Sequence, residues 1–247
     1  MKVFQIIKEG AKKFWKNPIL GIPTLLQIIA NYIPIIIVSV VLALITGVSV
    51  ISVILNPETI SDDILNKIIL WVSILLFILV GLLLIVNSFF EGMLLGMLKH
   101  GKRKLDFDSG GKFWARIFCF DLMFGIYMLI SAIIIIVTSI LTSISMWFAI
   151  IPILLAIVFL ISIPLFLLGA YYIVLNDLKV KEALRKSCKV VWKHYFKFLG
   201  LLLLLILITA TIILLLGWIQ VVGIILINLL SMTYLKICFY LFASSED

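Results

Sequence analysis

The sequence has few charged residues. Only 13% of its 247 residues are Asp, Glu, Lys or Arg, whereas 64% are hydrophobic. An ordinary soluble domain has about 25% charged residues, so this chain has too little polar surface to cover a globule in water. The composition excludes a water-soluble domain. It predicts an all-α, polytopic membrane helix bundle that occupies residues 1–247 as a single integral membrane domain.

Motifs for catalysis and for cofactors are also missing. The chain has no GxxxxGK[ST] loop, no HExxH or HxxEH zinc motif and no GxSxG serine motif. Its three cysteines share no CxxC spacing, so a disulfide framework is not expected. We therefore expect a protein without enzymatic activity, metal or cofactor, although sequence motifs do not test for a Ser–Lys dyad.

Long apolar runs are abundant, and six of them are long enough to cross a bilayer. A spanning helix needs about 20 apolar residues, because each residue rises about 1.5 Å across a hydrocarbon core about 30 Å thick. Four runs exceed this minimum, so we expect them to tilt, to project past the headgroups or to kink at Pro34, Pro152 or Pro164. The predicted transmembrane helices cover residues 23–55, 68–98, 113–143, 145–176, 198–218 and 219–242.

The basic residues are confined to alternate loops. All Lys and Arg except Lys67 and Lys236 precede the first span or lie between spans two and three or four and five. Cytoplasmic loops retain such residues, so both termini are predicted to be cytoplasmic, with the protein in the plasma membrane. The expected partners are anionic headgroups of membrane lipids, not nucleic acid. A membrane protein partner is a further expectation.

The three basic segments resemble one another. KEGAKKFWKNPILG begins at Lys8, SGGKFWARIFCFD at Ser109 and KEALRKSCKVVWKHYFKFLG at Lys181, and each leads into an odd-numbered span. The predicted unit is a cytoplasmic-side interfacial amphipathic helix followed by a helical hairpin, repeated three times over residues 1–99, 100–176 and 177–247. The alternative is that the three segments are alike without a repeat, because any positive-inside hairpin protein has basic, Trp-flanked inner loops.

The third segment has the clearest amphipathic pattern. Apolar residues recur on one face at i, i+4, i+7 and i+11, and cations form a row at i+4 spacing. Such a helix is expected to lie in the membrane plane with its cations at the phosphates, or simply to anchor the inner face of the bundle. The apolar positions are Leu184, Cys188, Val191 and Tyr195, and the candidate headgroup-binding residues are Lys181, Arg185, Lys189, Lys193 and Lys197.

Three charged residues fall well inside predicted spans, away from their ends, where charge is costly and often functional. Glu91, Asp121 and Lys236 all fall in the cytoplasmic third of the bilayer, so Lys236 can pair with either carboxylate. One interpretation is a cytoplasm-facing polar cavity for a proton, an ion or a lipid headgroup. The other is a structural ion pair that fixes helix register. The candidate polar cluster is Asn87, Glu91, Asp121 and Lys236.

Several smaller features predict local structure. Gly92 and Gly96 form a GxxxG pattern, which favours close approach of a second helix. Asp177, at the end of the fourth predicted span, is expected to cap a helix or to pair with Lys181. The residues expected to cap the middle interfacial helix are Asp106, Asp108 or Ser109.

Three stretches carry a family resemblance: WKNPILGIP at 15–23, EGMLLG at 91–96 and EALRKSCKVVWKHYFKFLG at 182–200. The layout resembles poorly characterised prokaryotic six-span membrane proteins, which include the membrane domain of some glycerophosphodiester phosphodiesterases. An Ala-Leu-x-x-Ser helix recurs there, and Ala183, Leu184 and Ser187 match it. The resemblance implies six helices with interfacial helices and implies no catalytic residues.

Two functional hypotheses follow. The first is a non-enzymatic, lipid-associated scaffold or a subunit of a membrane complex. The alternative is a small transporter or permease subunit that uses the layer of Glu91, Asp121 and Lys236.

Overall fold

The computed structural model describes residues 1–46, 62–102, 104–141, 150–216 and 220–246, and the regular structure within these ranges is helical. The predicted all-α class is therefore confirmed for the described residues. The helices are α1 (Val3–Lys16), α2 (Gly21–Thr46), α4 (Asp62–His100), α5 (Phe107–Leu141), α6 (Ile150–Phe166), α7 (Gly169–Asn176), α8 (Val180–Lys193), α9 (Tyr195–Leu216) and α10 (Gln220–Ser245), with a short 3₁₀ helix η1 (Pro18–Leu20) before α2.

Five helical stretches among the described residues are long and apolar enough to cross a membrane. α10 contributes a shorter apolar stretch, Leu229–Ser245, and the sixth predicted span includes residue 219, which lies outside the described residues. The five stretches indicate a multi-pass membrane protein, and the sixth crossing stays a prediction. They are Pro18–Val41, Ile69–His100, Phe107–Ile140, Ile150–Asn176 and Tyr195–Leu215.

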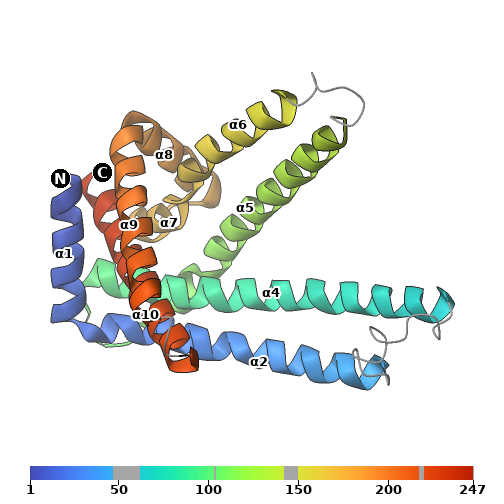
Figure 1. Cartoon of the computed structure of the whole chain (residues 1–247). Helices are drawn as coiled ribbons and strands as arrows, with labels where there is room; N and C mark the ends of the chain where they lie inside the picture. Colours follow the sequence, from blue (N-terminus) through green and yellow to red (C-terminus); the bar gives the residue numbers. More distant parts are fainter. Residues whose placement is uncertain (47–61, 103, 142–149, 217–219, 247) are drawn as a thin grey trace.

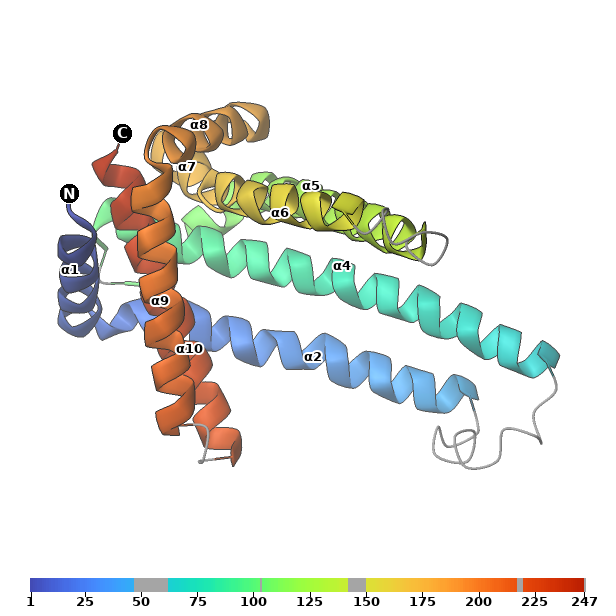
Figure 2. The ribbon, with the colours of Figure 1, turned by 45° about the horizontal axis from the view of Figure 1, so that its top comes forward.

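The helices form three hairpins, α2/α4, α5/α6 and α9/α10, that diverge from a common base (Figures 1 and 2). We use "the base" for α1, α7 and α8 together with the hairpin ends that meet them. Both chain termini lie at the base (Figure 1). The buried core is there too, and its largest fully buried side chains include Ile6, Met93, Leu94, Phe113, Ile117, Tyr172, Phe198 and Phe242.

The outer parts of the hairpins expose their apolar side chains. Phe77 of α4 is 81% exposed, and Leu214 of α9 is 72% exposed. The expected bundle is therefore packed at one end only. Because lipid chains are as apolar as these side chains, the outer helix surfaces need no protein partner when they lie in a membrane.

Close approach of α4 and α5 holds the base together. A Cβ atom placed on Gly96 would lie 2.2 Å from Cβ of Ser109, so only glycine allows the observed spacing. Asp106 caps α5, because its carboxylate accepts hydrogen bonds from the backbone N–H of Ser109 at 3.4 Å and from Oγ of Ser109 at 2.7 Å. Burial raises the pKa of Asp106, but hydrogen bonds from Ser109 and Lys102 outweigh this effect and leave its pKa below the ordinary value.

One of the three expected interfacial helices does not form as a separate helix. The first and third basic segments form the separate helices α1 and α8, but the middle segment forms the first turns of α5, which continues without a break to Leu141. The difference has a local cause. Asn17–Pro18 follows α1 and His194 interrupts the helix after α8, whereas α5 has no proline. The predicted kink at Pro164 is present as a break, since α6 ends at Phe166.

A pair of glycine substitutions on α4 tests the packing of the base. Gly96→Ala is expected to lower the free energy of unfolding by about 1–3 kcal/mol, because the new methyl group displaces α5. Gly81→Ala on the same helix is the matched control, since a Cβ at Gly81 meets no atom within 4 Å. This control is expected to be neutral or stabilising by up to about 1 kcal/mol. Thermal unfolding in detergent measures both, and equal stability of the two variants would contradict the packing described.

Candidate functional site

Glu91 and Lys236 form an ion pair where α4 meets α10. Nζ of Lys236 lies 3.5 Å from Oε2 of Glu91, and their side chains are only 12% and 18% exposed. The structure thus brings together two of the charged residues singled out from the sequence. Because the pair is mostly buried, removing either partner would leave the other charge without a counter-charge away from water.

An amide network extends from this ion pair to α2. Oδ1 of Asn87 accepts hydrogen bonds from Nε2 of Gln27 at 2.7 Å and from Nδ2 of Asn31 at 2.9 Å. Oε1 of Gln27 in turn accepts a long hydrogen bond of 3.5 Å from Lys236. The network therefore joins α2, α4 and α10.

Gln27 and Asn31 were not singled out from the sequence, although a signal for them exists. They are two amides at i, i+4 within a predicted span, the same spacing that relates Asn87 to Glu91. Polar residues at this spacing share one face of a helix, so they mark the face of α2 that contacts α4.

Asp121 stands apart from the ion pair. Its Oδ2 accepts a hydrogen bond of 3.0 Å from Ser88, and it forms no ion pair within the part of the chain that the structure describes. Asp121, Glu91 and Lys236 nevertheless line one cavity of about 200 Å³. A smaller cavity of about 120 Å³, lined in part by Gln27 and Asn31, also reaches Lys236.

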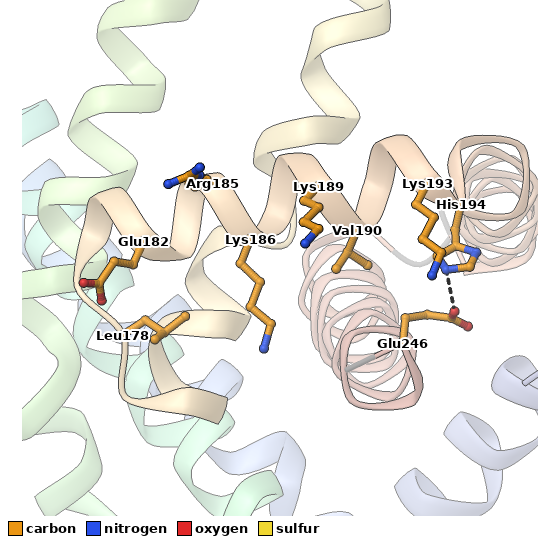
Figure 3. A pocket seen from close by; sticks show the side chains of 9 residues that line it. All are labelled: Leu178, Glu182, Arg185, Lys186, Lys189, Val190, Lys193, His194 and Glu246. Atoms are coloured by element: carbon orange, nitrogen blue, oxygen red, sulfur yellow. Dashed lines mark ion pairs between the residues drawn. The ribbon is translucent and has the colours of Figure 1, made fainter.

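A larger pocket of about 680 Å³ lies between α8 and the end of α10, and Figure 3 shows its lining. Lys186, Lys189 and Lys193 point from α8 toward the end of α10 that carries Glu246 (Figure 3). We call this site the basic pocket. Its charged lining consists of Glu182, Arg185, Lys186, Lys189, Lys193 and Glu246, together with His194.

Three cations of the basic pocket lack an anionic partner in the part of the chain that the structure describes. Arg185, Lys189 and Lys193 are exposed, and none of them forms an ion pair among the residues that the structure describes. Lys186 differs, because its ammonium lies 5.0 Å from the centre of the Tyr172 ring. The basic pocket therefore presents uncompensated positive charge.

Two candidate headgroup-binding residues, Lys181 and Lys197, do not line the basic pocket. Lys197 instead pairs with Glu246, whose other carboxylate oxygen lies 3.1 Å from Nε2 of His194. Burial raises the pKa of Glu246, but the hydrogen bond and charge of Lys197 outweigh it and leave the pKa below its ordinary value. Glu246 is thus ionised at neutral pH, and its two carboxylate oxygens contact Lys197 and His194.

The apolar face of α8 packs partly on protein rather than on lipid. Ala183, Ser187 and Val191 are buried, and Oγ of Ser187 donates a hydrogen bond to the Leu165 carbonyl. The predicted apolar positions Leu184 and Cys188 are half-buried beside this stripe. α8 therefore anchors the base, which was one of the two sequence interpretations.

Aromatic residues next to the basic row remain exposed. Trp192 is 69% exposed and Phe196 is 86% exposed, at the junction of α8 and α9. Indole and phenyl rings beside cations are typical of helices that lie at headgroup level. This junction can therefore contact lipid even though the rest of α8 is docked.

Asp177 pairs with α5 and not with Lys181. Its carboxylate lies 2.6 Å from Nη2 of Arg116 and 2.7 Å from Nζ of Lys112. Hydrogen bonds from Lys112 and Arg116 lower the pKa of Asp177 below its ordinary value. Asp177 also ends α7 in the left-handed conformation, with φ of 54°, so the turn that leads into α8 is held against α5.

The five apolar helical stretches indicate a multi-pass helical membrane protein. Its base has a polar cluster and a basic pocket. A family model described as a domain of unknown function (DUF7847) matches residues 1–235. The match covers most of the chain, so the chain belongs to this family. No curated protein and no solved structure matches the chain. The resemblance to the membrane domain of glycerophosphodiester phosphodiesterases stays a prediction.

A charge swap tests whether the Glu91–Lys236 pair stabilises the base. Glu91→Gln is expected to lower the free energy of unfolding by about 1–3 kcal/mol, because it leaves a mostly buried ammonium without its counter-charge. The double variant E91K/K236E is expected to recover at least half of that loss. Thermal unfolding in detergent measures the effect, with the exposed Glu9→Gln as control. A swap no more stable than E91Q would count against a direct pair.

Proposed function

We propose that this protein is a non-enzymatic membrane scaffold, or a subunit of a membrane complex, whose base is anchored to anionic lipid headgroups. The observation that carries this proposal is the basic pocket of about 680 Å³, in which Arg185, Lys189 and Lys193 lack an ion-pair partner among the described residues. A phosphate group supplies the missing negative charge and accepts charge-assisted hydrogen bonds from lysines of this pocket.

The surroundings of the basic pocket support a lipid as the source of that phosphate. Trp192 and Phe196 are exposed next to the row of cations. α1 repeats the combination, because Phe4 and Trp15 are 77% and 76% exposed beside lysines of the same helix. A soluble anion needs no neighbouring apolar side chains, whereas a lipid needs them for its glycerol and acyl groups.

The proposal includes six crossings, a three-fold repeat and a cytoplasmic base in the plasma membrane. The position of both termini at the base supports an even number of crossings (Figure 1). The concentration of basic residues in the base-side segments supports the cytoplasmic assignment. The placement of α1 before one hairpin and α8 before another supports the repeat for two of its three units.

The headgroup proposal predicts a loss of lipid affinity when the basic pocket is neutralised. The triple variant Arg185→Gln, Lys189→Gln, Lys193→Gln is expected to bind phosphatidylglycerol about a hundredfold more weakly. Each cation near a membrane surface contributes about 1 kcal/mol, and about 1.4 kcal/mol corresponds to a factor of ten. Calorimetric titration of a short-chain phosphatidylglycerol into protein in a maltoside detergent measures the affinity.

The matched control removes the same charge from α1, by Lys8→Gln, Lys12→Gln and Lys16→Gln, all of which are exposed. This variant is expected to lose much less affinity. If both triple variants lose affinity equally, the attraction belongs to the net charge of the base and the basic pocket is not a headgroup site.

A second candidate function is a small transporter or permease subunit. The observation that favours it is the position of Lys236, which lines a cavity on each side and pairs with Glu91 inside a predicted membrane layer. The E91K/K236E swap separates the two functions. A swapped protein that folds but loses solute-dependent growth favours transport, whereas full recovery of growth favours a structural ion pair.

The orientation predicts which side of the membrane each loop faces. A reporter fused after Gly101, at the base, is expected to be active only in the cytoplasm, and one fused after Asp62 only outside the cell. Paired alkaline phosphatase and fluorescent protein fusions in intact cells measure this. Accessibility of a tag at either terminus to an impermeant label would contradict the proposed orientation.

A further inference from the structure

Aromatic residues form a large part of the walls of the cavity shared by Glu91, Asp121 and Lys236. It lies where α4, α5, α7 and α10 meet, at the point from which the hairpins diverge. Phe124 and Phe166 are packed with ring centres 5.3 Å apart, and Tyr171 meets Phe239 edge to face at 6.0 Å. The aromatic residues that line the cavity are Phe120, Phe124, Phe166, Tyr171 and Phe239.

The charges around this cavity do not balance. Two carboxylates line it with one ammonium, and that ammonium is paired with Glu91. Asp121 has only the hydroxyl of Ser88 as a hydrogen-bond partner among the described residues. A carboxylate inside a membrane layer without a counter-charge is costly, so the cavity favours either a bound proton or a bound cation.

The size and chemistry of the cavity favour an organic cation. A volume of about 200 Å³ is well above the roughly 10–15 Å³ that holds one water molecule, so the cavity has room for a small organic molecule. A metal ion needs several converging oxygen or nitrogen ligands, and no group of three or more His, Cys, Asp or Glu suited to a metal is found among the described residues. Aromatic rings together with a carboxylate are the surroundings that quaternary and primary ammonium groups prefer.

We propose that this cavity binds an organic ammonium ion, with its charge at Asp121 and its alkyl groups against the aromatic walls. The ligand is either a small water-soluble ammonium compound or the ammonium headgroup of a lipid. Both sources share the same recognition chemistry. The site is separate from the basic pocket, which attracts the opposite charge, so it goes beyond the anchoring function.

The test uses the full chain in nanodiscs of phosphatidylglycerol, a lipid without an amine, with tetramethylammonium as the probe. Calorimetric titration is expected to show saturable binding that empty nanodiscs lack. tert-Butanol, an uncharged molecule of similar shape, is expected not to compete. Absence of saturable binding, or equal competition by tert-butanol, would overturn the proposal.

Variants assign the binding to the cavity. Asp121→Asn is expected to weaken tetramethylammonium binding at least tenfold, and Phe124→Leu several-fold, because the first removes the charge and the second an aromatic wall. Asp108→Asn removes an exposed carboxylate from the same helix and is the matched control, expected to bind normally. If D121N does not fold, F124L decides, and unchanged affinity in the folded variants would overturn the proposal.

A second series of nanodiscs separates the two ligand sources. If phosphatidylethanolamine in the nanodisc competes with tetramethylammonium, the ligand is a lipid headgroup. If the affinity is the same in both lipids, the ligand is a soluble ammonium compound. The triple variant of the basic pocket is expected to bind tetramethylammonium normally, so failure of the headgroup proposal and failure of this one are distinguishable.

Discussion

Apolar helices gain little from contacting each other in a bilayer, because acyl chains are as apolar as leucine or isoleucine. Packing within a membrane therefore depends on small residues that allow close approach and on polar groups that need partners. Both are concentrated at the base of this protein. Gly96 brings α5 against α4, and the Gln27–Asn87 hydrogen bond joins α2 to α4. The outer halves of the hairpins have neither feature to the same extent, and they diverge (Figures 1 and 2).

The base separates two charged environments of opposite character. The basic pocket is open, rich in lysine and flanked by exposed aromatic rings, so it suits an anion at headgroup level. The cavity at Asp121 is smaller, is lined in part by aromatic residues, and has an excess of carboxylate. Their combination is consistent with a protein that contacts both the charged surface of a membrane and a cationic group just beneath it. Asp177 and Glu246 hold the elements between the two sites through their ion pairs with α5 and α9.

Part of the candidate site was predictable from the sequence. Glu91 and Lys236 were singled out because a charge within an apolar run has few acceptable surroundings, and a partner of opposite sign at the same depth is the simplest one. Gln27 and Ser88 were not singled out, because neutral polar side chains occur in many spans and their partners depend on which helices are neighbours. The acidic end of the basic pocket was also missed. Glu246 lies far along the chain from α8, and no periodicity relates the two.

The sequence by itself determined that the chain is helical, that its apolar runs need lipid and that its cations gather in the segments that form the base. These properties follow from composition and from residue order along single helices, which set local hydrogen bonding and the cost of leaving water. Only the tertiary structure decided that α8 packs its apolar stripe on α6 and α7, that Asp177 pairs with Arg116 rather than Lys181, and that Asp121 has no ion-pair partner among the described residues. Those outcomes depend on distances between helices far apart in the sequence, and these distances are set by side-chain shape at each contact.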